Sequence, residues 1–236
     1  MLLLAADTSG QNGSIALAEA TDGQSRVRIV EVLPLDGRAF SAQLVPQISG
    51  LLQKHGRSKD QLSAFAVVTG PGSFTGIRVG LAAIKAFAEA LKKPVVSISL
   101  LEAIARVAQP RSRVLAVRVL AVLDAGRTDV YVGDYEVDSS DRTVVRMHSE
   151  RLLSREELLR EAHGAPTKTV LTADSLLAAG LQSAGVEVEL VEYPDSSVIA
   201  QFGWERLQRA ETVRAEDLEA NYVRHSTGAK VVVKPH

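Results

Sequence analysis

The chain has 236 residues, of which 46% are hydrophobic and 23% are charged, as in an ordinary globular protein with a substantial core. Its formal net charge of −1 provides no strong field for recruiting nucleic acid or an anionic membrane. It contains no cysteine, which excludes disulfides, thiolate catalysis and cysteine metal sites and is typical of a reducing, cytoplasmic environment.

The first third of the sequence predicts strands followed by a helix. Residues 2–6 are all apolar, as in a strand covered on both faces, and they meet Asp7 too early for a signal peptide. The turn cluster Asp7-Thr8-Ser9-Gly10 follows, and residues 14–19 and 27–33 predict two more strands. A helix is expected from Ser41. No run in the chain reaches the length of a membrane span.

A glycine-rich segment, Thr69–Gly80, is the most informative part of the sequence. It joins a predicted strand to a predicted helix that ends at Leu91, and Ser73 or Thr75 can cap that helix. The third glycine comes one residue too late for G-x-G-x-x-G, and Gly76 is not followed by the lysine of a Walker A loop. The loop can therefore cradle an anion or act as a packing device, and the sequence leaves both interpretations open.

The helix after this loop has three stripes at helical spacing. The apolar stripe consists of Ile77, Leu81, Ile84, Ala88 and Leu91. A polar stripe consists of Arg78, Lys85 and Lys92. The third stripe has small side chains and is continued by an aromatic one: Gly76, Gly80, Ala83 and Phe87. Glycine inside a helix costs about 1 kcal/mol relative to alanine, so a close neighbour should offset it. That neighbour is either internal or a partner protein, and we expect a partner interface at Gly76, Arg78, Gly80, Ala83 and Phe87.

The second half repeats the opening pattern. The polar break after Gln109 predicts two domains, residues 1–109 and 110–236. An apolar strand then ends at Asp124, a turn follows, and residues 129–136 return as a strand, as around Asp7. Helices are expected to begin at residues 154, 175 and 196, alternating with strands at 169–171 and 186–191, before an extended piece at 221–224 and a tail at 228–236.

Together these segments resemble the TsaB (YeaZ) family of bacterial proteins, which are needed to make threonylcarbamoyladenosine in transfer RNA. The resemblance is carried by Thr69–Gly80, by Asp7-Thr8-Ser9, and by Val122-Leu123-Asp124-Ala125 with Val130-Tyr131 and Tyr222-Val223-Arg224. It implies an α/β fold of two related actin-like domains (ASKHA, ribonuclease H-like). It also implies a glycoprotease-like relative of TsaD, the subunit that transfers threonylcarbamoyl to adenosine 37.

The resemblance further implies a non-catalytic scaffold that binds TsaD through helices of the first domain. The TsaE ATPase is implied as a further partner, and tRNA is reached only through the complex. In isolation a homodimer is expected, since a self-complementary patch closes as a two-fold pair. The expected location is the cytoplasm, without membrane contact.

Catalytic groups are hard to assign. A metal site of the TsaD type needs a His-x-x-x-His pair, and no two of the five histidines are four residues apart. Asp7, Thr8 and Ser9 are a plausible phosphate loop and Asp124 belongs to a poorer one, while the adenosine glycines are missing near Thr172. We therefore expect no metal, no required cofactor and at most weak ATP or ADP binding. Turn capping is the alternative role of both aspartates. A free-standing glycoprotease-like peptidase and a degenerate sugar-kinase-like ATP-binding enzyme stay open as other functions.

Overall fold

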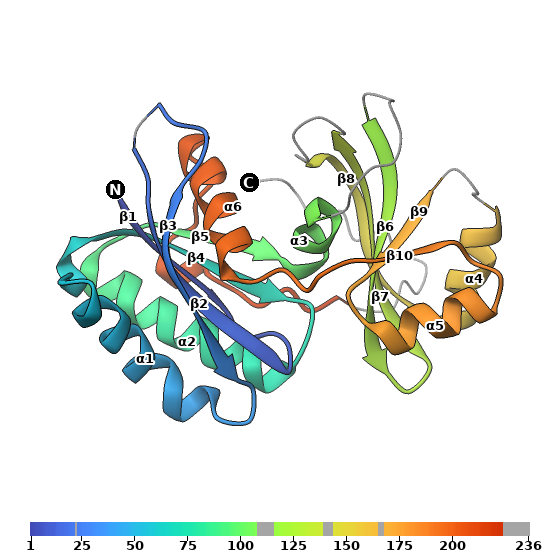
Figure 1. Cartoon of the computed structure of the whole chain (residues 1–236), viewed down its shortest axis with the longest axis horizontal. Coiled ribbons are helices and arrows are strands. Elements are labelled where there is room, and N and C mark those ends of the chain that lie inside the picture. The colour runs from blue at the N-terminus through green and yellow to red at the C-terminus, as the bar shows by residue number, and fades with distance from the viewer. Residues whose placement is uncertain (22, 108–115, 139–143, 165–167, 224–236) are drawn as a thin grey trace. The chain divides into compact units, whose positions relative to one another are not determined.

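The computed structural model describes residues 1–21, 23–107, 116–138, 144–164 and 168–223. Over these residues the chain is an α/β protein with two five-stranded mixed sheets (Figure 1). Contacts within the chain divide it into two units. The first contains Met1–Leu100 and Pro194–Asn221, and the second contains Leu101–Tyr193 and the described end from Tyr222.

The first unit is built on a sheet with the strand order β3-β2-β1-β4-β5. Its strands are β1 (Leu2–Asp7), β2 (Asn12–Glu19), β3 (Arg28–Asp36), β4 (Leu62–Gly70) and β5 (Val95–Ser99). β1 is antiparallel to β2 and parallel to β4, β2 is antiparallel to β3, and β4 is parallel to β5. Every residue of β1 is buried, as expected for a central strand covered on both faces.

Helices cover both faces of this sheet. α1 (Phe40–Lys54) and α2 (Phe74–Leu91) lie on one face and α6 (Ser196–Gln208) on the other (Figure 1). Gly203 lets α6 approach closely, because a Cβ there would meet the side chains of Ala66 and Leu3. Two short 3-10 turns, η1 (Lys59–Gln61) and η2 (Ala215–Asp217), complete this unit. α3 (Leu100–Val107) follows β5 directly, and its residues from Leu101 group with the second unit.

The second unit has a sheet with the order β10-β9-β6-β7-β8. Its strands are β6 (Ala116–Gly126), β7 (Asp129–Asp138), β8 (Val144–Ser154), β9 (Thr169–Thr172) and β10 (Val188–Leu190). α4 (Arg155–Gly164) and α5 (Ser175–Ser183) supply Leu158, Leu177 and Leu181 to a core that β6 and β7 line with Val122 and Val132.

The two sheets have the same connectivity. In each, the first three strands form an antiparallel meander, and two further strands then add in parallel on the other side of the first strand. The predicted α/β fold of two related domains is confirmed.

The structure differs from the sequence-based expectation in two respects. Strand β8 was not predicted, and α6 groups with the first unit although residues 110–236 were expected to form one domain. The expected boundary after residue 109, Arg224 of the extended piece and the tail at 228–236 lie outside the described residues.

Candidate functional site

The turn after β1 is closed on itself. Asp7, Thr8 and Ser9 are each at most 2% exposed. The Asp7 Oδ1 atom accepts hydrogen bonds from the backbone N–H of Ser9 at 2.8 Å and from its hydroxyl at 2.6 Å. The carboxylate therefore caps its own turn, and a backbone N–H that could receive a phosphate is already engaged.

The glycine-rich segment lies directly against this turn. The backbone N–H of Ser73 donates to the carbonyl of Ser9 at 2.7 Å, and the Thr8 hydroxyl donates to the carbonyl of Gly76 at 2.7 Å. A Cβ added at Gly72 or Gly76 would lie less than 3.0 Å from the carbonyl oxygen of Ser9 or Thr8, respectively. The close approach that these glycines permit is thus an approach to the chain's own first turn.

The start of α2 uses its own cap. Ser73, one of the two predicted candidates, is the N-cap residue, and its hydroxyl accepts from the backbone N–H of Gly76 at 3.2 Å. The carbonyl of Ser73 also accepts from the N–H of Ile77 at 2.9 Å. Of the two interpretations of the loop, packing is therefore the one that these contacts favour.

The small-residue stripe of α2 mostly faces inward. Gly76 and Gly80 are buried, and a Cβ at Gly80 would lie less than 3.0 Å from the Thr8 hydroxyl. Ala83 and Phe87 are partly buried and pack against the core of the unit, where the Phe87 ring stacks on Phe65. Of the five residues predicted as a partner interface, Arg78 alone is exposed, and the interface role of the others remains a prediction.

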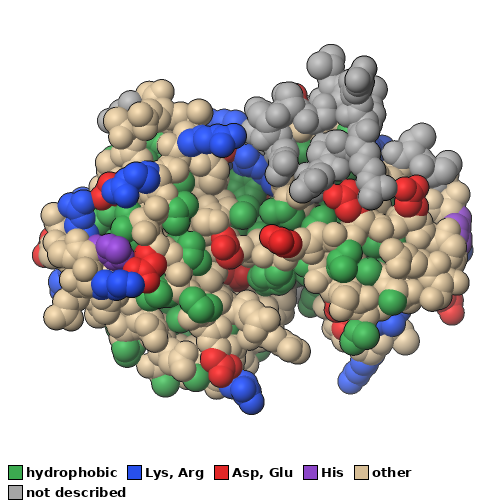
Figure 2. Space-filling model, in the orientation of Figure 1, with side chains coloured by type: hydrophobic (Ala, Val, Ile, Leu, Met, Phe, Trp, Pro, Cys, Tyr) green, Lys and Arg blue, Asp and Glu red, His purple; other side chains and the backbone are tan. Residues whose placement is uncertain are grey.

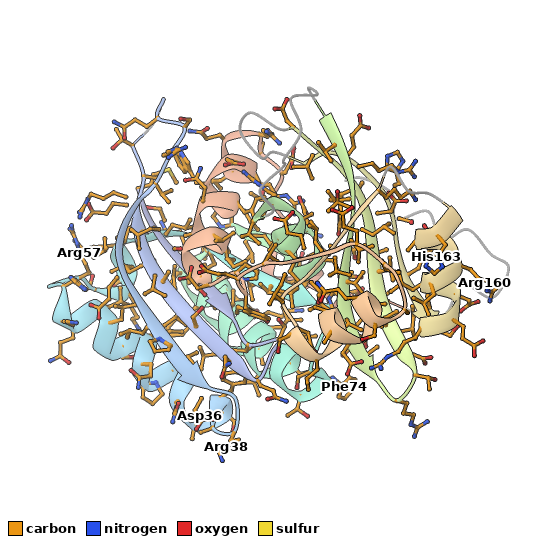
Figure 3. The ribbon with its side chains drawn as sticks, turned by 45° about the vertical axis from the view of Figure 1, so that its right-hand side comes forward. Asp36, Arg38, Arg57, Phe74, Arg160 and His163 are labelled. Carbon is orange, nitrogen blue, oxygen red and sulfur yellow. The ribbon has the colours of Figure 1, made fainter. Side chains whose placement is uncertain are left out.

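A different set of α2 side chains faces outward at four-residue spacing. We call it the α2 face: Phe74, Arg78, Ala82, Ala86 and Ala90. The Phe74 ring is 54% exposed and is labelled in Figure 3. The Arg78 guanidinium lies 3.8 Å from its centroid, a cation–π contact that orders both side chains. The i, i+4 repeat of small residues was visible in the sequence, but only burial shows which stripe faces outward.

The second predicted loop is an open surface turn in the other unit. The Asp124 carboxylate accepts from Arg155 Nη2 at 3.0 Å, and both side chains are more than one third exposed. Gly126 and Arg127 follow with left-handed φ angles of 86° and 56°. The resemblance implies adenosine-binding glycines after Thr172. At this position Asp174 instead caps α5, where its carboxylate accepts from two backbone N–H groups at 2.9 and 3.0 Å. Asp7, Asp124 and Asp174 thus each contact another group of the chain itself.

A partly buried ion network in the second unit was not predicted from the sequence. Asp134 on β7 is 3% exposed and accepts from Arg118 at 2.8 and 2.9 Å and from Lys168 at 2.9 Å. Lys168 also donates to Glu161, which pairs with Arg151. Burial raises the pKa of Asp134, but the hydrogen bonds from Arg118 and Lys168 outweigh it and the net pKa is lowered. This network ties three strands to α4.

Two kinds of feature are absent from residues 1–21, 23–107, 116–138, 144–164 and 168–223. Among them, no group of three or more His, Asp or Glu side chains is placed to hold a metal ion. In the same part of the chain, no helix is both long and apolar enough to cross a membrane.

Comparisons with known proteins agree with the fold. Residues 34–200 match the family model described as TsaD, tRNA N6-adenosine threonylcarbamoyltransferase. The structure of YeaZ from Pseudomonas aeruginosa superimposes with a TM-score of 0.71, at 23% identity over 94% of this chain and 100% of that one. The fold is therefore that of the actin-like (ASKHA) class of two-domain α/β proteins.

Relatives identified by sequence indicate the group within this class to which the chain belongs. The tRNA threonylcarbamoyladenosine biosynthesis protein TsaB of Escherichia coli is 32% identical over 140 residues, 59% of this chain and 57% of that protein. TsaB of Haemophilus influenzae is 34% identical over 131 residues, 56% of this chain and 52% of that protein. The chain thus matches only about half the length of these relatives. It belongs to the TsaD-related family and, within it, to the TsaB (YeaZ) group.

Proposed function

We propose that this chain takes part in the biosynthesis of threonylcarbamoyladenosine in tRNA as a non-catalytic scaffold for a catalytic subunit of the TsaD type. Family membership supports the pathway, since the curated relatives carry that name. One observation carries the non-catalytic role: the turn at Asp7–Ser9 is buried and closed by the chain's own glycine-rich segment. Phosphate binding in a turn needs exposed N–H groups, whereas the N–H of Ser9 is buried and already donates to the Asp7 carboxylate.

The proposal therefore includes no required cofactor, with weak ATP or ADP binding at most. The peptidase and kinase alternatives are tested on the purified chain alone. We expect no peptidase turnover with or without added Zn²⁺, and no ATP hydrolysis above buffer. Metal-dependent peptide cleavage, or ATP hydrolysis by the lone chain, would show that the chain is an enzyme in its own right.

The proposed docking surface is the α2 face. Three alanines on successive turns allow the backbone of another helix to approach closely, and the exposed Phe74–Arg78 pair supplies an aromatic and a guanidinium anchor of the kind found at interface hot spots. We propose that the catalytic subunit docks here, that a TsaE-type ATPase joins this complex, and that tRNA is reached through it. The isolated chain is proposed to pair with its own copy through the same face in the cytoplasm.

Ala86→Arg tests this docking surface. Ala86 is exposed and central in the α2 face, so the isolated fold tolerates arginine, whereas a docked helix would bury an unpaired charge there. Such burial costs about 3–5 kcal/mol, which weakens the complex more than 100-fold. Ala179→Arg on the exposed side of α5 is the matched control. Calorimetric titration with the catalytic subunit should show loss of binding for Ala86→Arg alone. Equal affinities for the two variants would place the docking surface elsewhere.

A further inference from the structure

One end of the first unit carries a carboxylate that holds two arginines. Glu19 is the last residue of β2, where it lies between Leu2 on β1 and Arg28 on β3. Its Oε2 atom pairs with Arg28, and its Oε1 atom accepts from Arg57 Nη2 at 2.5 Å. The two guanidinium groups are thus fixed side by side on one carboxylate.

A second carboxylate beside it repeats the arrangement. Glu31 on β3 accepts from Lys54 Nζ at 2.6 Å and lies 2.7 Å from His55 Nε2. Lys54 and His55 form the end of α1, where the helix dipole also favours positive charge. We call this cluster the basic end of the unit: Glu19, Arg28, Glu31, Lys54, His55 and Arg57.

The charges of the basic end are unevenly exposed. The side chains of Arg28, Lys54 and Arg57 are 68%, 62% and 40% exposed, whereas those of Glu19 and Glu31 are 29% and 19% exposed. The cations are therefore more exposed than the carboxylates that hold them. Lys and Arg side chains gather on this side of the first unit in Figure 2, and Arg57 is labelled there in Figure 3.

The basic end is separate from the other surfaces of the unit. Glu19 pairs with the first residue of β1, and the closed turn at Asp7 follows the last residues of the same strand, so the two features lie at opposite ends of the sheet. The α2 face lies on a different helix from Lys54 and His55. The cations therefore have no part in closing the turn or in forming the proposed docking surface.

We propose that the basic end binds the phosphate backbone of an RNA. An arginine fork has five N–H donors, and the contact with Glu19 engages each guanidinium through Nη2, so donors that match a phosphate are retained. Two ordered guanidinium groups side by side suit neighbouring phosphates on one strand. The choice of RNA over an acidic protein rests on the proposed function, since a complex that modifies tRNA must hold a polyanion. Because the whole chain has a net charge of −1, the attraction must come from this local cluster, and arginine–phosphate contacts weaken as salt rises.

The test measures the binding of a fluorescent synthetic RNA stem–loop by anisotropy over a series of salt concentrations. The chain is measured alone at low salt and again with the catalytic subunit. The double variant Arg28→Gln/Arg57→Gln is compared with Arg160→Gln/Arg209→Gln, which removes the same charge from exposed residues elsewhere. We expect the first pair to lose about tenfold in affinity at low salt and to flatten the plot of log affinity against log salt by about 2. The control pair should lose less than twofold, and Arg28→Lys/Arg57→Lys should keep the salt dependence of wild type but bind less tightly, because an ammonium lacks the planar fork.

Thermal unfolding confirms that each variant is folded. The proposal is overturned if the two glutamine double variants bind RNA with equal affinity. It is also overturned if the wild-type chain binds no RNA alone and does not raise the RNA affinity of the complex. Loss of binding to the catalytic subunit with RNA affinity intact would show that the basic end contacts an acidic protein instead. The lone-chain measurement does not depend on the scaffold role, so failure of the scaffold role and failure of RNA binding are distinguished.

Discussion

Gly80→Ala probes the closure of the first turn by α2. In an open helix this change stabilises by up to about 1 kcal/mol, because alanine has the higher helix propensity. Here the added Cβ would lie less than 3.0 Å from the Thr8 hydroxyl, which itself donates to the carbonyl of Gly76. Overpacking costs about 1–3 kcal/mol, and loss of that hydrogen bond about 0.5–1.5 kcal/mol. We expect a net destabilisation of about 1–3 kcal/mol.

Urea denaturation followed by circular dichroism measures this change, and two comparisons make it specific. Gly50→Ala in α1 introduces a Cβ with no heavy atom within 4 Å, so it should stabilise by about 0.5–1 kcal/mol. Thr8→Ala removes the hydroxyl that meets the new methyl group, so the Gly80→Ala cost should be smaller by about 1 kcal/mol in the Thr8→Ala background. If Gly80→Ala is as stable as Gly50→Ala, the stripe does not close against Thr8 and the reasoning fails.

Two further outcomes follow from the second unit. Asp134→Asn leaves Arg118 and Lys168 without their shared carboxylate. The free energy of unfolding at neutral pH, measured by urea denaturation, should therefore be lower by about 2–4 kcal/mol. The pKa of Asp134 is lowered in the folded state, so its contribution to the free energy of unfolding is present above the ordinary pKa of 3.8 and is lost as the pH falls through the lower folded value. The free energies of unfolding of wild type and variant should therefore converge in acid. A constant difference between them down to pH 2 would contradict this. Asp124→Ala removes an exposed pair with Arg155, and its free energy of unfolding, measured by urea denaturation, should fall by less than about 1 kcal/mol; a larger loss would mean that the turn depends on this contact.

Much of the fold could be predicted from periodicity. The buried side of α2 is formed, as expected, by Ile77, Leu81, Ile84 and Ala88. Apolar residues at helical spacing lie on one face of a helix, and burying that face removes them from water. The repeated strand-and-aspartate pattern likewise predicted two related domains. Strand β8 was missed because it is an edge strand whose charged and polar residues interrupt the apolar alternation.

The candidate site was less predictable, for a different physical reason. A glycine in a helix indicates that another group packs closely against it. That group belongs to a distant part of the sequence, so the residues around the glycine do not identify it. Thr8 lies 68 residues before Gly76, so the contact between them appears only when β1 and β4 pair. The exposure of Ala82 and Ala86 depends in the same way on where the sheet lies beneath α2.

The central claim is tested most directly by titrating this chain into the catalytic subunit and measuring threonylcarbamoyladenosine formed in tRNA, with the ATPase subunit and the adenylate-forming enzyme present. The account predicts no product from this chain without the catalytic subunit, a rate that rises and saturates near one chain per catalytic subunit, and the same curve for Asp124→Ala. Full activity of the catalytic subunit before any of this chain is added, or product formed by this chain without it, would contradict the scaffold role.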